Sequence, residues 1–301
     1  METRVLANEL RRALPGLRLL EGEPMAAHCS FRIGGPAELF AEPADEAELL
    51  ALLGLLRAHG VRPLLLGKGT NVLVADAGLR GVVVHIGEGL DAVRVTGTRL
   101  EAGAGVPLAV LAQRAREHAL SGLEFAHGIP GSLGGAVVMN AGAYDGEMKD
   151  VVRAVRYLDA AGTVHETDDP GFAYRRSRFS DGESVVLSAA LELHPGDGEA
   201  IAARMRELAE KRRSKQPLDR PSAGSTFKRP ARGYAAALIE GAGLKGCAVG
   251  GAQVSEKHAG FIINTGNASC ADVLALMDLV RARVYEQYGV ELEPEVRIVG
   301  V

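Results

Sequence analysis

Two glycine-rich segments hold the residues of this sequence that are best suited to bind a phosphate group. The first, residues 122–144, is apolar enough to be buried, yet repeated glycines and Pro130 keep it almost bare of side chains. Glycines let backbone N–H groups approach an anion closely, so this segment could bind a pyrophosphate. A tight buried loop that binds nothing is the alternative interpretation.

The second segment, residues 61–76, carries five small or polar residues between two short apolar stretches that read as strands. These residues are Gly67, Lys68, Gly69, Thr70 and Asn71. The segment lacks the third glycine and the following helix of a dinucleotide fingerprint, and it lacks the Gly-Lys-Ser/Thr of a P-loop. It is therefore a candidate phosphate-binding turn of another kind, with an ordinary β-hairpin as the alternative.

Hydrophobic periodicity and capping residues predict the helices and strands that would position these segments. The spacing predicts a helix over 45–59, with Asp45 as its N-cap and Gly60 just past its end. Further helices are expected over 107–119, 199–213, 234–239 and 271–288, the last with Ser269 as its N-cap. Strands are expected over 81–86, 92–96, 98–102, 151–158, 163–166, 184–193 and 291–299, and the residues Thr96 and Gly97 predict a hairpin between the second and third of them.

Composition and charge narrow the classes of function. The 301 residues are 47% hydrophobic, which is enough for two or three domains with cores of their own. The net charge of −4 argues against nucleic acid as a partner, and the basic residues 211–215 are interpreted as a solvated helix end. No stretch resembles a signal peptide or reaches the roughly 18 apolar residues of a membrane span, so we expect a cytoplasmic protein without membrane contact.

Neither a metal site nor a disulfide framework is expected. The three cysteines, Cys29, Cys247 and Cys270, are far apart and form no Cys-x-x-Cys motif. The eight histidines are scattered and form no His-Glu-x-x-His motif.

Both glycine segments and their flanks resemble the UDP-N-acetylenolpyruvoylglucosamine reductase family, over nearly the whole chain. The matching blocks follow one another in the family's order. They are Ser-Phe-Arg-Ile-Gly-Gly-Pro-Ala at 30–37, Gly-Lys-Gly-Thr-Asn-Val-Leu at 67–73, Gly-Ile-Pro-Gly-Ser-Leu-Gly-Gly at 128–135, Met-Asn-Ala-Gly-Ala-Tyr at 139–144, Tyr-Arg-Arg-Ser at 174–177, Pro-Ser-Ala-Gly-Ser-Thr-Phe-Lys at 221–228, Gly-Leu-Lys-Gly at 243–246 and Leu-Glu-Pro-Glu-Val-Arg at 292–297. The chain resembles the family's shorter form, because we find no loop bearing the longer form's substrate-closing tyrosine.

The resemblance implies an α+β architecture. Two subdomains would form an FAD-binding fold of the vanillyl-alcohol oxidase type, and a C-terminal α+β domain would bind the substrate. We expect these parts at residues 1–90, 91–195 and 196–301, with the Pro- and Gly-containing residues 194–198 as the last linker.

The resemblance also implies a reaction. The family uses NADPH and FAD to reduce UDP-N-acetylglucosamine enolpyruvate to UDP-N-acetylmuramate, a precursor of peptidoglycan. We expect the FAD to be bound noncovalently, because the sequence has two phosphate-binding segments and no clear attachment residue. Arg175 matches the cation that stabilises the developing negative charge, Ser225 the proton donor, and Glu295 an acid that assists protonation. From local sequence alone, Arg175 could instead form a surface ion pair, Ser225 could bond its own turn, and Glu295 could face solvent.

Binding roles follow from the same matched blocks. The resemblance assigns the FAD pyrophosphate and ribose to Gly67, Lys68, Gly69, Thr70, Asn71, Gly128, Pro130, Gly131, Ser132 and Gly134. It places Asn140, Ala141 and Gly142 beside the flavin. Candidates for the UDP-sugar are Tyr174, Lys215, Lys228 and His258, because its two phosphates call for cations.

Two other functions are compatible with parts of the sequence. A flavin oxidase of the same fold, acting on a small alcohol, would need none of the matched Arg175, Ser225 and Glu295. A non-catalytic FAD or UDP-sugar binding module would explain the glycine segments but would need no proton donor.

Overall fold

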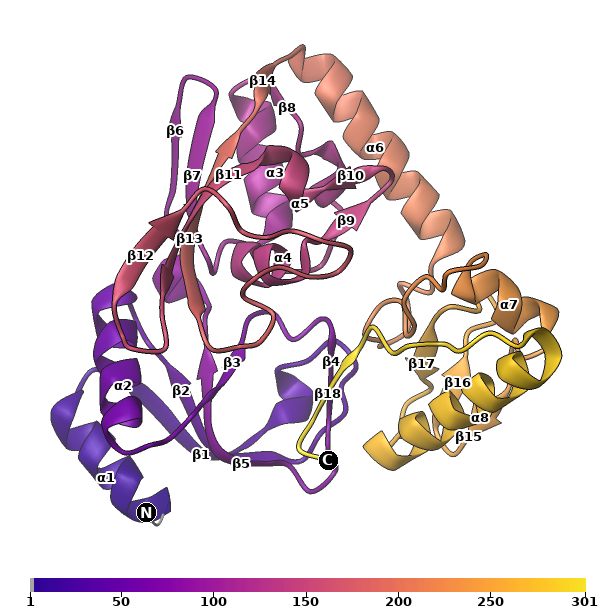
Figure 1. The fold of residues 1–301 in the computed structure, drawn as a ribbon, viewed down its shortest axis with the longest axis horizontal. Coiled ribbons are helices and arrows are strands. Elements are labelled where there is room, and N and C mark those ends of the chain that lie inside the picture. Colours follow the sequence, from indigo (N-terminus) through magenta and orange to yellow (C-terminus); the bar gives the residue numbers. More distant parts are fainter. Residues whose placement is uncertain (1–2) are drawn as a thin grey trace. The chain divides into compact units, whose positions relative to one another are not determined.

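The computed structural model describes residues 3–301, which form two compact units (Figure 1). Unit 1 contains the chain up to Glu21, Leu39–Lys68 and Gly81–Lys211. Unit 2 contains Gly22–Glu38, Gly69–Arg80 and Arg212–Val301. Each unit therefore combines segments that are far apart in the sequence.

The main sheet of unit 1 is antiparallel and has the strand order β12-β11-β13-β7-β6. Its strands are β6 (Val93–Thr96), β7 (Arg99–Gly103), β11 (Val152–Leu158), β12 (Val164–Thr167) and β13 (Val185–Glu192). Gly97 has φ +60° in the tight β6–β7 turn, a backbone conformation that favours glycine. The hairpin predicted from the sequence is confirmed.

A second sheet has the order β1-β2-β5-β3, with β3 and β5 parallel. Its strands are β1 (Arg18–Pro24), β2 (Pro36–Glu42), β3 (Leu64–Leu66) and β5 (Leu79–His85). Two short ribbons pair β8 (Leu120–Ser121) with β14 (His194–Pro195), and β9 (Gly142–Ala143) with β10 (Gly146–Glu147). Three short 3₁₀ turns are η1 (Met25–Ala27), η2 (Glu88–Leu90) and η3 (Glu124–Ala126).

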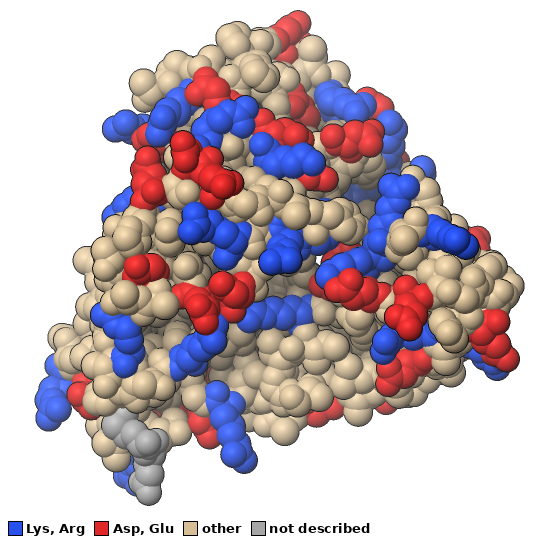
Figure 2. Space-filling view, viewed as in Figure 1, with Lys and Arg blue, Asp and Glu red and all other residues tan. Residues whose placement is uncertain are grey.

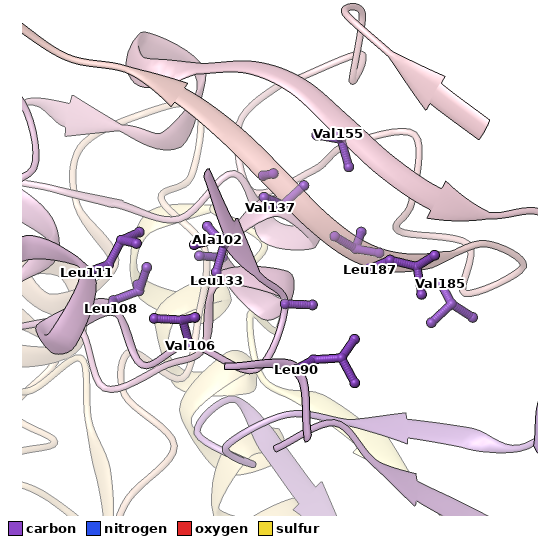
Figure 3. Close-up of a cluster of buried hydrophobic side chains, with 14 of the residues drawn as sticks. Leu90, Ala102, Val106, Leu108, Leu111, Leu133, Val137, Val155, Val185 and Leu187 are labelled. Carbon is purple, nitrogen blue, oxygen red and sulfur yellow. The ribbon is translucent and has the colours of Figure 1, made fainter. Parts of the chain in front are cut away.

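Helices cover the core of unit 1. They are α1 (Thr3–Ala13), α2 (Glu46–Ala58), α3 (Leu108–Glu117), α4 (Leu133–Met139), α5 (Met148–Val151) and the first part of α6 (Gly198–Lys215). Figure 3 shows Leu108 and Leu111 of α3 and Leu133 and Val137 of α4 directed toward Ala102 on β7. This packing fixes α4, and with it the middle of the first glycine segment, against the main sheet.

Unit 2 is built around a three-stranded antiparallel sheet. Its strands are β15 (Ala248–Val249), β16 (Ala252–Val254) and β17 (Ile262–Asn264), and it packs against α8 (Cys270–Tyr288), which also contacts α7 (Ala235–Gly241). Separately, β4 (Val72–Val74) pairs in parallel with β18 (Arg297–Val299). None of the helices within residues 3–301 is long and apolar enough to cross a membrane.

Predictions based on caps agree well with the structure. The Asp45 carboxylate accepts a hydrogen bond from the Glu48 N–H at 2.8 Å, so α2 begins where the sequence predicts. Ser269 caps α8 in the same way, within a capping box. The strand predicted over 291–299 is wrong in its first part: Pro294 forms only an isolated antiparallel bridge with Phe227, and only Arg297–Val299 are paired as a strand.

The three-part division at residues 90 and 195 stays a prediction.

Charges of both signs are interspersed over the face of the molecule seen in Figure 2, in keeping with the small net charge. Nucleic acid as a partner therefore gains no support from that face.

Candidate active site

The two glycine segments meet in unit 1. A Cβ atom built on Gly67 would lie 2.5 Å from the Ser132 Oγ, so these residues are in van der Waals contact although 65 positions separate them. The hairpin interpretation of the second segment is wrong, because β3 pairs with β5 while β4 pairs with β18. The turn at Gly67 and Lys68 is thus free to lie against the first segment rather than against a partner strand.

Of the two glycines in α4, Gly135 is the one whose lack of a side chain is not explained by packing within the fold. It is exposed, and a Cβ atom there would meet only the Ser132 Oγ, at 3.7 Å. Among the described residues, its N–H has no hydrogen-bond partner. Glycine destabilises a helix relative to alanine, so a bare backbone at this position fits a ligand that approaches closely.

Two of the predicted cofactor-binding glycines have structural reasons instead. At Gly134 a Cβ atom would lie 2.9 Å from the Ala104 Cβ, in the contact between α4 and the end of β7. Gly69 has φ +58°, and a Cβ atom there would overlap the carbonyl oxygen of His28. The fold alone therefore requires glycine at both positions.

Gly135→Ala should raise the stability of the apoprotein and lower its affinity for FAD. Alanine favours the helix by about 0.5–1 kcal/mol, whereas its methyl group would occupy space that we assign to the cofactor. Apoprotein melting temperature and FAD titration give the two values. Gly54→Ala is the matched control, because Gly54 lies inside α2 with no atom within 4 Å of an added Cβ, and it should change stability only. Unchanged FAD affinity in Gly135→Ala would remove this position from the cofactor site.

Gly69→Ala should destabilise the apoprotein by more than about 2 kcal/mol, because a left-handed backbone and an overlap with backbone atoms add together. Gly97→Ala is the reference: Gly97 has φ +60° but no atom within 4 Å of an added Cβ. Urea unfolding of both apoproteins measures the difference. Equal free energies of unfolding would contradict the close approach of His28 as the reason for Gly69.

An open cavity of about 400 Å³ lies in unit 1. It is lined by the β9–β10 hairpin, the residues that follow it and two predicted site residues, namely Gly142, Ala143, Tyr144, Asp145, Gly146, Glu147, Lys149, Asp150, Tyr174 and Arg175. The structure thus brings Gly142, which we expect beside the flavin, together with Tyr174 and Arg175. The sequence analysis did not single out Glu147 or Lys149.

Strained backbone is concentrated around this cavity. Six non-glycine residues in the described chain have positive φ, and four of them are Asn140, Tyr144, Asp145 and Arg175. Tyr144 and Asp145 form the two-residue turn between β9 and β10, and Arg175 lies in a second tight turn. Unfavourable backbone conformations of this kind persist where a site needs a fixed geometry.

Charged side chains surround Arg175 in the cavity. The Lys149 Nζ lies 2.9 Å from the Glu147 Oε2, and this contact is the main cause that lowers the pKa of Glu147. A hydrogen bond from Asn140 and the charges of Lys149 and Arg175 lower that pKa further. Glu147 is therefore a carboxylate in the neighbourhood of the Arg175 guanidinium.

Ser225 and Glu295 lie close together in unit 2, on two segments that pair antiparallel. The Glu295 N–H donates to the Thr226 carbonyl oxygen at 2.8 Å, and the Lys228 N–H donates to the Glu293 carbonyl oxygen at 2.9 Å. Ser225 is exposed and Glu295 is half-buried. The exposed hydroxyl of Ser225 can thus reach a ligand, and it has no hydrogen bond within the described residues.

Asn71 supports Glu295 through the backbone. Its side-chain Nδ2 donates to the Glu295 carbonyl oxygen at 3.0 Å, and its own carbonyl accepts from the Arg297 N–H at 3.0 Å. The polar residue that we predict in the cofactor turn therefore also fixes the segment that carries Glu295.

Three basic residues gather in unit 2. Burial is the first cause that lowers the pKa of His258, and the charges of Lys245 and Lys215 lower it further. The His258 Nδ1 accepts a hydrogen bond from the Gly260 N–H at 3.2 Å. Lys228 forms an ion pair with Glu293. Lys245 was missed by the sequence analysis, although it belongs to the matched block at 243–246.

The predicted site residues divide between the units. Gly67, Lys68, Gly128, Pro130, Gly131, Ser132, Gly134, Asn140, Ala141, Gly142, Tyr174 and Arg175 belong to unit 1. Gly69, Thr70, Asn71, Lys215, Ser225, Lys228, His258 and Glu295 belong to unit 2. Within residues 3–301, no group of His, Cys, Asp and Glu side chains is arranged to hold a metal ion.

Comparison with known proteins identifies the family. Residues 37–168 match a family model described as an FAD binding domain, and residues 216–299 match the C-terminal domain of UDP-N-acetylenolpyruvoylglucosamine reductase. The UDP-N-acetylenolpyruvoylglucosamine reductase of Caldanaerobacter subterraneus subsp. tengcongensis is 50% identical over 298 residues, which cover 98% of both chains. The chain belongs to the UDP-N-acetylenolpyruvoylglucosamine reductase family. The resemblance seen in the sequence is confirmed, and with it the class of enzyme, an oxidoreductase.

Solved structures agree with this family and with the predicted fold class. The UDP-N-acetylenolpyruvylglucosamine reductase of Thermus caldophilus is 35% identical, with a TM-score of 0.79 over 94% of this chain and 98% of its own. An alkyldihydroxyacetonephosphate synthase, 16% identical, has a TM-score of 0.50 over 64% of this chain and 40% of its own, a likeness in fold alone. The predicted α+β fold class, an FAD-binding domain followed by the C-terminal domain of the reductase family, is confirmed.

Proposed function

We propose that this chain reduces the enolpyruvyl group of UDP-N-acetylglucosamine enolpyruvate to give UDP-N-acetylmuramate, using FAD and NADPH, in peptidoglycan precursor synthesis. The observation that carries this proposal is the 50% identity to a reductase of that name over nearly the full length of both chains. We place the reaction in the cytoplasm, in agreement with the prediction from the sequence.

FAD would bind to the bare backbone where the two glycine segments meet. The contact of Gly67 with Ser132 and the open side of Gly135 support this placement. FAD supplies hydride chemistry when it is bound. We expect noncovalent attachment: the Cys29 thiol is buried, donates to the Ile33 carbonyl oxygen at 3.1 Å and has a pKa that burial raises, so it is a poor nucleophile.

Arg175 would stabilise the negative charge that develops on the substrate when a hydride is added to its double bond. A guanidinium binds a carboxylate through a planar pair of donors and stays charged at any working pH. Its place in a tight turn that lines the cavity supports this role, because a fixed cation stabilises charge without reorganisation.

Ser225 would donate a proton to the carbon next to the one that receives the hydride. Its exposed hydroxyl and the pairing of its segment with that of Glu295 support this role. Glu295 would assist as the neighbouring acid. Both groups belong to unit 2.

The UDP group would bind to basic residues of unit 2. The charge of Lys215 lowers the pKa of His258, which supports both residues as neighbours in one site. The charge of Lys245 acts on His258 in the same way, so we add Lys245 to the proposed site. Lys228 would exchange Glu293 for a phosphate oxygen, since a phosphate is the more highly charged partner.

An anaerobic two-step experiment tests the function. NADPH is first added to the FAD-loaded protein, and UDP-N-acetylglucosamine enolpyruvate follows once the flavin absorbance is bleached. We expect the absorbance to return with the second addition. A reduced flavin that ignores the enolpyruvyl substrate and reacts rapidly with oxygen would indicate an oxidase instead.

A further inference from the structure

The turn that carries Arg175 is held in an unfavourable conformation. The Ala173 N–H donates to the Arg176 carbonyl oxygen at 2.9 Å, and the Arg176 N–H donates back to the Ala173 carbonyl oxygen at 3.2 Å. Tyr174 and Arg175 occupy the tip, and Arg175 has φ +54°. An arginine rarely adopts this left-handed backbone, so contacts outside the turn must stabilise it.

Asn140 supplies one of those contacts from the end of α4. Its side chain is 1% exposed, and its Nδ2 donates to the Ala173 carbonyl oxygen at 3.1 Å and to the Glu147 Oε2 at 2.8 Å. Its Oδ1 accepts from the Lys149 N–H at 2.9 Å. Both amide donors are thus used inside the protein, which fits a role in holding the turn better than a direct bond to the flavin.

A second anchor holds the other end of the turn. The hydroxyl of Ser177, which is 2% exposed, donates to the Val138 carbonyl oxygen at 2.9 Å. Val138 is in the last turn of α4, where carbonyl groups lack a helical partner. Both ends of the segment 173–177 are therefore tied to the end of one buried helix.

Glu147 connects this framework to the guanidinium itself. It accepts a hydrogen bond from Asn140, contacts Lys149 and interacts electrostatically with Arg175. The same carboxylate therefore accepts a hydrogen bond from the amide that holds the turn and lines the same cavity as Arg175.

We propose that Asn140 and Glu147 are positioning residues that fix the Arg175 guanidinium in the cavity, Asn140 by holding the carbonyl of Ala173 and Glu147 by orienting Asn140 and the cation. Asparagine suits position 140 because it tolerates the left-handed conformation seen there, φ +41° and ψ +55°, and offers two donors with one acceptor. Aspartate keeps the backbone and the acceptor but cannot make either donation. This inference rests on the role proposed for Arg175.

Asn140→Asp should slow flavin reoxidation by the enolpyruvyl substrate about 10- to 100-fold, the effect of a misplaced catalytic group. FAD affinity and the rate of flavin reduction by NADPH should stay within about twofold of the wild type, because Asn140 donates to no cofactor in this arrangement. Glu147→Gln, which keeps an oxygen for Asn140 but loses the charge, should give a smaller defect. Stopped-flow absorbance of each half-reaction measures these rates.

A double-mutant cycle separates positioning from an independent effect. In an Arg175→Gly background, adding Asn140→Asp should slow reoxidation no further, because the group being positioned is gone. Hydrogen exchange tests the stability of the turn without measuring enzyme activity. The Arg176 amide should exchange faster in Asn140→Asp than in the wild type. Thr98→Val is the control, since it removes a side-chain hydrogen bond to a different carboxylate, that of Glu192, in the same unit.

The outcomes distinguish this inference from the proposed function. If Arg175→Gly slows reoxidation while Asn140→Asp does not, or if the two effects multiply in the double variant, the positioning role is wrong and the function stands. Loss of FAD affinity in Asn140→Asp would also overturn it, in favour of a direct contact with the cofactor. If Arg175→Gly itself leaves reoxidation unchanged, the proposed mechanism fails first.

Discussion

Ser225→Ala should leave flavin reduction by NADPH near the wild-type rate and slow reoxidation by the enolpyruvyl substrate about 10²–10⁴-fold. Loss of proton transfer from a positioned group has an effect of this size. Reduction of the flavin precedes any protonation of the substrate, so only the second half-reaction should respond. Stopped-flow absorbance measures each half-reaction in turn.

Two further variants sharpen this result. Ser225→Cys keeps an ionisable hydrogen at the same position and should recover part of the lost rate. Ser222→Ala changes a serine three residues earlier in the same segment, whose backbone accepts a bond from the Ser30 hydroxyl, and it should have little effect. Unchanged reoxidation in Ser225→Ala would assign the proton to Glu295, and equal slowing of both half-reactions would mean general damage to the site.

Arg175→Gly should slow reoxidation about 10²–10³-fold, the loss expected when one group that stabilises transition-state charge is removed. Glycine is the cleanest replacement, because it accepts the φ of +54° that the turn requires. Arg175→Lys should be intermediate, since an ammonium keeps the charge but not the planar pair of donors.

The neighbouring arginine provides the control for charge. Arg176→Gln removes an exposed guanidinium one residue away while the backbone pairing of the turn remains. It should change reoxidation less than twofold when the rates are measured under the same conditions. A defect in Arg176→Gln as large as that in Arg175→Gly would indicate a general effect of positive charge on substrate binding.

Local signals were sufficient for elements with their own start and stop residues. Asp45 and Ser269 mark the starts of α2 and α8 within one residue, because a capping side chain acts on backbone groups only a few positions away. Gly97 marks the β6–β7 turn for a similar reason. The amphipathic helix α1 escaped the sequence analysis.

The glycine segments show where local signals fail. The sequence does not distinguish Gly69 and Gly134, which are required by neighbouring backbone and side chains, from Gly135, whose open side the fold leaves unexplained. Those contacts join positions such as 28 and 69, or 104 and 134, and they exist only after folding. The helix α4 was missed because glycines and the apolar residues around them resemble a loop.

Asn140 illustrates the same limit for the candidate site. Sequence similarity places it beside the flavin, whereas its buried hydrogen bonds reach Ala173, 33 residues later. A motif shows which residue type a position holds, but not which residue that side chain bonds in the folded chain. The proximity of the segments that carry Ser225 and Glu295, 70 residues apart in the sequence, was predictable only through the resemblance to the family.

The pairing of β18 with β4 has a consequence for the order in which the chain can fold during synthesis. Arg297–Val299 bond to Val72–Val74, so the ribosome must add more than 220 residues before β4 meets its partner. Unit 1 ends at Lys211 and can assemble earlier. Until synthesis reaches residue 299, β4 lacks its partner strand, and an unpaired strand edge of this kind exposes the nascent chain to aggregation.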